Sequence, residues 1–313
     1  MDWRLVDDPL LGPQQALVRV KACGVNRADI AQKQGNYPPP SGASRILGLE
    51  LAGEIVALPD HAPAHLYEGQ AVAALVPGGA YATMAAVDVS LLHPIPQNWS
   101  WPYAAAIPEA LYTAYLNLFW EARLQAGESV LVHAAAGGIG SMAVQMAALH
   151  GAKVIATAGT PEKLEFVRAL GADLALNYKE DDLKKSIRHF APEGVHVVFD
   201  TVGGENYAAL HPSVMAAYGR WVLIGLLGGR MARLDLGKIL VRNLRLIGST
   251  LRSRPLAVKR KLAREIGATW WPRLESGALR MHIDRVIFAP KAEEAHRQMM
   301  ENRSTGKLVL EMP

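Results

Sequence analysis

The chain has 313 residues, a formal net charge of +4, 50% hydrophobic residues and 20% charged residues. This length can bury a sizeable core and favours two domains over one. No apolar run approaches the roughly 18 to 20 residues that cross a bilayer, and the N-terminus lacks the pattern of a secretory signal. The single cysteine, Cys23, excludes an intramolecular disulfide and cysteine-based zinc lobes, so we expect a globular, cytoplasmic protein.

The first hundred residues contain short Val-, Ala- and Ile-rich stretches that are interrupted by Gly and Pro, as in 16–25, 51–58 and 70–75. Such stretches are typical of strands in a compact, mainly β domain. The sequence changes its pattern near Ser129, where apolar strands begin to alternate with helical stretches. The strands are predicted at residues 129–134, 153–158, 174–178, 195–203 and 220–226.

This alternation predicts an α/β unit with a doubly wound parallel sheet that is covered on both faces. After it we expect a helix at 256–277, a strand at 282–288, a helix at 291–302 and a strand at 307–312. These last elements are expected to return to the first domain. The predicted boundaries are therefore 1–107 with 252–313 for a catalytic domain, and 108–251 for a nucleotide-binding domain.

A glycine-rich turn, "AAAGGIG" at 134–140, follows the first strand of the α/β unit and opens a helix. Small residues there let the backbone approach a pyrophosphate at the positive end of the helix dipole. The alternative is a tight turn that serves only to pack the helix against the strand. The predicted cofactor-binding residues in this turn are Ala135, Gly137, Gly138, Ile139 and Gly140.

The end of the next strand distinguishes between cofactors. NAD sites usually place Asp or Glu there to bind the ribose 2′-hydroxyl, whereas this chain has Ala158 and Gly159. A 2′-phosphate could instead accept hydrogen bonds from Thr160 and Lys163, with Tyr178 closing over it. The prediction is NADPH, although Thr160 could also act as an ordinary helix N-cap, and both roles can hold together.

Basic residues are scattered except in the segment 252–267, "RSRPLAVKRKLAREIG". We interpret this segment as a helix with a solvated basic face, so a nucleic-acid partner is possible but not indicated, and none is expected. Trp270 and Trp271 follow it and are interpreted as core residues. Cys23 is interpreted as a small buried hydrophobic residue.

Several segments, in order along the chain, resemble the medium-chain dehydrogenase/reductase superfamily, and within it the zinc-free quinone oxidoreductase branch that includes zeta-crystallin. They include "GVNRADIAQKQGNYPPP", "AAAIPEALYTAY", "AAAGGIG", "FDTVGG", "GRWVLIGLLGG" and "STGKLVLEM". The resemblance implies a GroES-like, mainly β catalytic domain and a Rossmann NADPH-binding domain. Family members usually have one more strand at the start, so the first family strand is expected to be missing.

The chain departs from the zinc-dependent alcohol dehydrogenases of this superfamily at the positions of the zinc ligands. Those positions correspond to Asn26, Leu49 and Glu109, and a leucine cannot bind a metal. The four-cysteine structural zinc lobe is also missing. We therefore expect no metal, and a reaction that needs little polarisation of a carbonyl group.

The resemblance also implies roles for individual residues. Asn26 and Tyr37 are expected to lie at the nicotinamide and substrate and to donate hydrogen bonds to a developing oxyanion. Asn26 could instead cap or turn a loop, and Tyr37 could serve only loop packing. The other residues that the resemblance assigns to the cofactor are Thr113, Gly203, Gly225, Ser249, Leu251 and Lys307.

The predicted function is NADPH-dependent, zinc-independent reduction of a quinone. Reduction of the double bond of an enone or alkenal is the close alternative, and a non-catalytic NADPH-binding protein with a regulatory or RNA-binding role is another. The natural acceptor and the proton donor stay open, because Asn26 and Tyr37 are not obvious acids at neutral pH. We also expect a homodimer that pairs through the apolar edge strand at 244–250.

Overall fold

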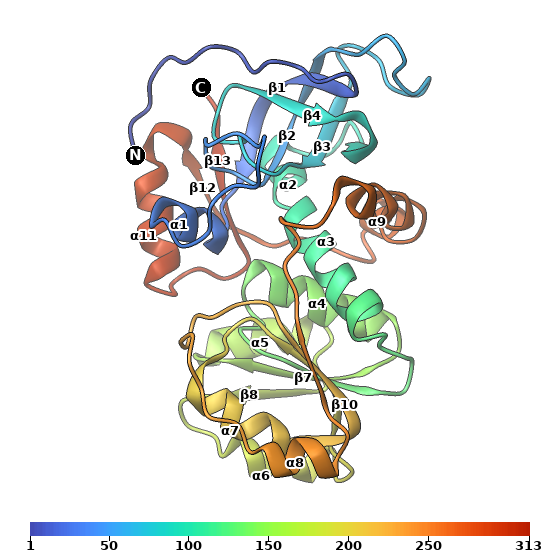
Figure 1. Cartoon of the computed structure of the whole chain (residues 1–313), viewed down its shortest axis with the longest axis vertical. Coiled ribbons are helices and arrows are strands. Elements are labelled where there is room, and N and C mark those ends of the chain that lie inside the picture. The colour runs from blue at the N-terminus through green and yellow to red at the C-terminus, as the bar shows by residue number, and fades with distance from the viewer. The chain divides into compact units, whose positions relative to one another are not determined.

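The computed structural model describes residues 1–313, and the chain divides into two compact units (Figure 1). Unit 1 contains Met1–Tyr112 and Arg252–Pro313, and unit 2 contains Thr113–Leu251. The chain passes from one unit to the other within helix α3 (Pro108–Tyr115). None of the helices combines the length and the apolar character that a membrane span requires.

Unit 1 is built on a seven-stranded sheet in the order β12-β13-β1-β2-β3-β5, with β4 also paired to β1. The C-terminal strands enter this sheet because β13 pairs antiparallel with β1 and parallel with β12. The strands are β1 (Gln15–Gly24), β2 (Glu50–Ala57), β3 (Ala71–Leu75), β4 (Met84–Asp88), β5 (Leu92–Pro94), β12 (Ile283–Phe288) and β13 (Lys307–Glu311).

The core of unit 1 is formed mainly by aliphatic side chains from both ends of the chain. Val18, Leu51 and Leu308 are fully buried together, and Cys23 belongs to the same cluster. The interpretation of Cys23 as a small buried hydrophobic residue is therefore confirmed. The helices of this unit include α1 (Arg27–Lys33), α2 (Trp101–Ala105), α9 (Leu256–Thr269), α10 (Trp271–Glu275) and α11 (Ala292–Met300).

The single helix predicted at 256–277 is wrong, because the structure has two helices, α9 and α10, which meet at Trp270. Pro272 lies in the first turn of α10, where its missing N–H costs no helical hydrogen bond. Trp270 and Trp271 are 4% and 5% exposed, which confirms that they pack in the core.

Unit 2 is a six-stranded sheet in the order β11-β10-β9-β6-β7-β8, and all of its pairs are parallel. This is the Rossmann order, in which the chain first builds one half of the sheet and then returns to build the other. The strands are β6 (Ser129–Val132), β7 (Lys153–Ala158), β8 (Leu174–Asn177), β9 (Val195–Asp200), β10 (Met215–Leu223) and β11 (Arg245–Gly248).

Helices cover both faces of the sheet of unit 2, with α4 and α5 on one side and α6, α7 and α8 on the other (Figure 1). Their bounds are α4 (Gly138–Leu149), α5 (Pro161–Ala169), α6 (Leu183–Phe190), α7 (Gly204–Val214) and α8 (Leu236–Val241). Because both faces are covered, the central strands carry runs of buried apolar residues, and Val130, Leu131 and Val132 are all 0% exposed. The predicted fold class is confirmed.

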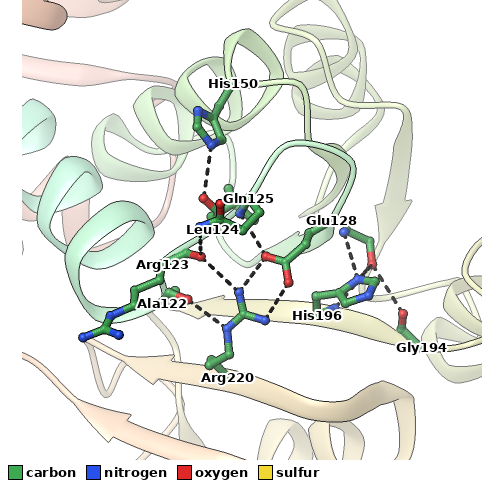
Figure 2. Close-up of polar contacts among 10 residues, drawn as sticks. Ala122, Arg123, Leu124, Gln125, Glu128, His150, Gly194, His196 and Arg220 are labelled. Atoms are coloured by element: carbon green, nitrogen blue, oxygen red, sulfur yellow. Dashed lines mark hydrogen bonds and ion pairs between the residues drawn. The ribbon is translucent and has the colours of Figure 1, made fainter.

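A clamp around Arg220 joins strand β10 to the segment that precedes β6, as Figure 2 shows. The guanidinium donates to both carboxylate oxygens of Glu128 at 2.8 and 2.6 Å, and its Nε donates to the Ala122 carbonyl at 2.8 Å. Burial raises the pKa of Glu128, but the hydrogen bonds from Arg220 and Gln125 outweigh it, and the pKa is lowered. This clamp orders the entry into the first strand of unit 2.

Candidate active site

The glycine-rich turn of unit 2 connects β6 to the N-terminus of α4. Gly137 is the N-cap of this helix, and its N–H donates to the Ala134 carbonyl at 3.0 Å. A Cβ atom on Gly140 would lie 2.4 Å from the Ala134 oxygen and 2.7 Å from the Cα of Ala135. Glycine at 140 is therefore required for α4 to begin this close to the turn.

The first turn of α4 has no capping side chain, so its backbone N–H groups are free to bind an anion at the positive end of the helix dipole. The predicted residues of this turn lie together here: Ala135, Gly137, Gly138, Ile139 and Gly140. The arrangement suits a pyrophosphate, since no Cβ or side chain caps the helix end.

The end of β7 carries no acidic side chain, because the strand stops at Ala158 and Gly159 follows. Thr160 is the N-cap of α5, and its Oγ1 accepts a hydrogen bond from the Lys163 N–H at 3.4 Å. The N-cap role is thus confirmed, and the phosphate-binding role stays a prediction. Tyr178, 45% exposed, lies against Gly159, where a Cβ atom would be 2.7 Å from the phenol oxygen.

Two further glycines bring the ends of β9 and β10 into backbone contact. Gly203 has φ +61°, and a Cβ atom on Gly225 would lie 2.3 Å from the Thr201 oxygen. The carboxylate of Asp200 holds this turn, because its Oδ1 accepts the N–H groups of Val202 and Gly203 at 2.8 and 2.9 Å. Asp200 was missed by the sequence analysis, although it lies in the quoted motif "FDTVGG".

Thr113 is 7% exposed and its hydroxyl has no hydrogen-bond partner, which makes it an orphaned buried polar group. Its carbonyl accepts the side-chain amide of Asn117 at 2.7 Å. Ser249 extends the ladder beyond β11 by donating its N–H to the Leu223 carbonyl at 3.0 Å, and Leu251 is buried. Their cofactor-binding roles stay predictions.

In unit 1, Asn26 lies in a buried polar cluster with Glu50 and Lys307. The Asn26 amide Nδ2 donates to Glu50 at 2.9 Å, and its Oδ1 accepts from the Lys307 ammonium at 2.7 Å. Lys307 also pairs with Glu50 and donates to the Val25 carbonyl at 3.3 Å. These contacts fix the plane of the Asn26 amide. The structure places Lys307 with Asn26, and its assignment to the cofactor stays a prediction.

Asp29 extends this cluster at the start of α1. Its carboxylate accepts the N–H groups of Asn26 and Gly48 at 2.8 and 3.0 Å, and the phenol of Tyr81 at 3.3 Å. Burial raises the pKa of Asp29 to about 6, against the opposing effect of the two backbone hydrogen bonds. Asp29 therefore holds the backbone of Asn26 in place.

The positions that correspond to zinc ligands carry Asn26, Leu49 and Glu109, and Leu49 is 1% exposed. No group of three or more His, Cys, Asp or Glu side chains is placed to hold a metal ion. Glu109 lies in the first turn of α3, and its N–H donates to the Glu50 carboxylate at 2.8 Å. Burial, followed by the charge of Glu50, raises the pKa of the Glu109 carboxyl to about 8.

Tyr37 lies beside Arg252, whose guanidinium is 5.4 Å from the centre of the phenol ring. Arg252 also donates to the carbonyls of Pro77 at 2.7 Å and Tyr37 at 3.2 Å, and the Lys259 ammonium donates to the Arg252 carbonyl at 2.6 Å. Burial, followed by the charge of Glu109, raises the pKa of the Tyr37 phenol.

The interpretation of 252–267 as a helix with a solvated basic face is wrong for two of its basic residues. Arg252 is 4% exposed and Lys259 is 7% exposed, and both are hydrogen-bonded inside unit 1. Their charges are tolerated because carbonyl oxygens accept hydrogen bonds from both side chains. No local sequence signal indicates the burial of Arg252, since the carbonyls of Pro77 and Tyr37 that accept from it come from other segments.

Two family models match the chain. "Alcohol dehydrogenase GroES-like domain" matches residues 12–97, and "Zinc-binding dehydrogenase" matches residues 138–266. Prostaglandin reductase-3 of Mus musculus is 32% identical over 97% of this chain and 83% of its own length. Quinone oxidoreductase-like protein 2 of Mus musculus is 31% identical over 96% of this chain and 86% of its own length.

Solved structures of similar fold indicate the same family. A quinone oxidoreductase of Thermus thermophilus, also solved with NADPH, has a TM-score of 0.83 and 32% identity, covering 98% of this chain and 95% of its own. The Escherichia coli quinone oxidoreductase complexed with NADPH has a TM-score of 0.87 and 26% identity, covering 99% and 94%. The chain therefore belongs to the medium-chain dehydrogenase/reductase superfamily, in its quinone oxidoreductase-type branch.

Proposed function

We propose that this oxidoreductase reduces quinones with NADPH and without a metal ion. The observation that carries the proposal is the set of side chains at the positions of the zinc ligands. These are the amide of Asn26, the carboxyl group of Glu109 and the buried side chain of Leu49, which cannot bind a metal. Quinones suit such a site because their reduction gains aromaticity and needs little Lewis-acid help. The relatives named as quinone oxidoreductases support this choice of substrate.

The residues of unit 2 fit NADPH. The uncapped N-terminus of α4 would hold the pyrophosphate, and Thr160 and Lys163 would bind the 2′-phosphate, because no carboxylate stands at the end of β7 to repel it. Tyr178 would cover this group. The buried Thr113 hydroxyl, which lacks a partner, would donate to the cofactor. When bound, NADPH supplies the hydride.

The residues of unit 1 would orient the acceptor and stabilise the charge that develops on it. Asn26 uses one amide hydrogen on Glu50 and retains the second for a carbonyl oxygen of the acceptor. The Tyr37 phenol is protonated at neutral pH, because its pKa is raised, and it can donate a second hydrogen bond. If both donors reach the same oxygen of the acceptor, they would act as an oxyanion hole.

Reduction of a conjugated enone is the second candidate. The same two donors would polarise an enone carbonyl, and the chain is 32% identical to prostaglandin reductase-3 of Mus musculus, which is named a reductase of another substrate class. Enone reduction differs from quinone reduction in the atom of the acceptor that receives the hydride. The third candidate is a protein that binds NADPH but reduces no acceptor.

NADPH oxidation measured against a panel of quinones and one enone, with NADH in parallel and on metal-stripped protein, tests the proposal. Quinone turnover that prefers NADPH supports it. Turnover of the enone alone supports the second candidate. Tight NADPH binding without turnover of any acceptor contradicts both and favours the binding role.

We further propose that two copies pair through the edge of the sheet of unit 2. Strand β11 is the edge strand, and it leaves one side of its backbone without a partner strand. Large apolar side chains on this strand and in the segment that precedes it along the chain are exposed, namely Met231, Leu236, Leu240, Val241 and Leu246. A second copy related by a two-fold axis would cover both the edge and these side chains.

A further inference from the structure

No other group of the protein donates a hydrogen bond to the carboxyl oxygens of Glu109, unlike those of the other buried acids around it. Glu50 accepts from Asn26, Lys307 and the Glu109 N–H, and Asp29 accepts from two N–H groups and a phenol. Glu109 contributes only its backbone N–H to this network, and it is 8% exposed. A buried acid without donors favours its protonated form, in which it has a proton to give.

Charged and titratable groups surround Glu109 from every element packed near it. Glu50 on β2 and Asp29 on α1 raise its pKa, while Lys307 on β13 and Lys259 on α9 lower it, and the Arg252 guanidinium also interacts with the charge of Glu109. Burial and the charge of Glu50 dominate, so the pKa is about 8 and the group is mostly protonated at pH 7. The Tyr37 phenol lies close enough for the charge of Glu109 to affect its pKa.

The same surroundings can also accept the carboxylate that remains after proton loss. The Lys259 ammonium interacts favourably with a charged Glu109. Glu109 also lies in the first turn of α3, where the helix dipole stabilises a negative charge. A group that is protonated at rest and tolerated as an anion meets the two requirements of a general acid.

Resting on the proposed function, we propose that Glu109 is the proton donor of the reduction. Hydride addition to the β-carbon of an enone moves the π electrons onto the carbonyl oxygen and gives an enolate. Glu109 transfers its proton to the α-carbon of the enolate, where a C–H bond forms and the carbonyl is restored, while the O–H bond of the carboxyl breaks and a carboxylate remains. With a quinone, the hydroquinone monoanion receives the same proton. Water then reprotonates Glu109, so each cycle consumes one hydride and one proton.

The test compares wild type with Glu109→Gln, which keeps the shape of the side chain and removes the acidic proton. With an enone, kcat is expected to fall about 100-fold or more, the effect typical of losing a general acid. The NADPH Kd, measured by fluorescence, is expected to stay unchanged. Glu54→Gln is the matched control, because Glu54 lies on β2 with a partly exposed side chain that forms a surface ion pair with Lys21.

The pH profile separates a proton donor from a structural residue. Wild-type kcat is expected to fall as the pH rises through the pKa of Glu109, about 8, because the acid form is required. Glu109→Gln should lose this transition and the solvent isotope effect on kcat. Glu109→Asp, which retains an acidic group, should recover part of the rate and keep the pH transition.

A spectroscopic measurement tests the protonation state independently of turnover. Infrared difference spectra of wild type against Glu109→Gln should show a carboxylic acid C=O band at pH 7 that disappears at high pH. Should Glu109→Gln fail to fold, Glu109→Asp and the wild-type titration provide the same readout. Absence of the band at pH 7 overturns the proposal.

The outcomes distinguish this inference from the proposed function. If wild type reduces the acceptors and Glu109→Gln matches it in kcat and pH profile, the inference fails and the proposed function stands. If wild type binds NADPH but reduces no acceptor, both fail. A fall in kcat with loss of the pH transition and unchanged NADPH binding supports both.

Discussion

The Nε2 atoms of His133 and His211 lie 2.9 Å apart in the interior of unit 2, where both side chains are 0% exposed. One ring donates and the other accepts, and burial lowers the pKa of both, so both imidazoles are neutral at pH 7. His133 also bonds the Thr157 hydroxyl through Nδ1 at 2.9 Å, and the His211 Nδ1 is 3.9 Å from the Asp200 carboxylate that holds the Gly203 turn. The pair thus joins the ends of β6, β7 and β9.

The first prediction concerns acid stability. Burial lowers the pKa of His133 to about 3 and that of His211 well below 6.5. The unfolded chain therefore binds more protons below pH 6.5, and stability falls as the pH decreases from 6.5 toward 3, by up to about 1.4 kcal/mol per pH unit for each histidine. Opening free energies of residues 195–203 from hydrogen exchange should show this decline.

The matched variant is His211→Gln, which keeps a polar partner for His133 and removes one titrating ring. It should lower by up to one the number of protons taken up on opening, and so reduce the slope of the opening free energy against pH. An unchanged slope would show that the pair does not control acid stability in unit 2.

The second prediction concerns the turn before α4. Gly140→Ala would place a methyl group 2.4 Å from the Ala134 oxygen, so α4 must move away from the pyrophosphate position. We expect the NADPH Kd to rise by at least about tenfold. Gly267→Ala is the control, because its Cβ meets nothing nearer than 3.8 Å and it lies within α9. Equal Kd values for both variants would contradict the prediction.

The third prediction concerns cofactor preference. If Lys163 makes a charge-assisted hydrogen bond to the 2′-phosphate, Lys163→Ala should raise the KM for NADPH about 10- to 100-fold and leave the KM for NADH unchanged. Lys184→Ala, an exposed lysine on α6, is the control. A loss of affinity that is equal for both cofactors would assign Lys163 a structural role instead.

The fourth prediction concerns the clamp around Arg220. Glu128→Gln removes the charge that two guanidinium nitrogens bind, and we expect a loss of about 1 to 3 kcal/mol in the unfolding free energy of unit 2. Because the pKa of Glu128 is lowered, its contribution is present above its unfolded pKa and disappears as the pH falls through its folded value. Chemical denaturation at pH 7 and pH 3 measures both effects. Glu193→Gln, an exposed glutamate, should change neither.

The fifth prediction concerns the proposed dimer. Leu240 is 78% exposed on α8, close in sequence to the edge strand β11, and Leu240→Glu would place a charge in the proposed interface. Light scattering should find a dimer in wild type and a monomer in the variant. A wild-type monomer that persists at high concentration would contradict the pairing.

Local sequence determined most of the secondary structure and the turns of unit 2. Residues 134–140 and 158–163 could be interpreted directly, because a strand, a turn and a helix that follow one another are specified by neighbouring residues. The resemblance then located Asn26 and Tyr37 by position. It could not supply their surroundings, because those come from distant segments.

Tertiary structure decided which buried groups meet. Lys307 contacts Glu50 and Asn26, which lie more than 250 residues away in the sequence. Arg220 contacts Glu128 across 92 residues. Arg252 and Lys259 are buried, although they lie in a segment that is basic enough to suggest a solvated face. The free energy of a buried charge depends on partners that only the folded chain brings near it. For that reason the sequence showed only that Glu109 occupies a position where zinc-dependent relatives have a ligand. That its carboxyl group is protonated could be inferred only from its surroundings in the fold.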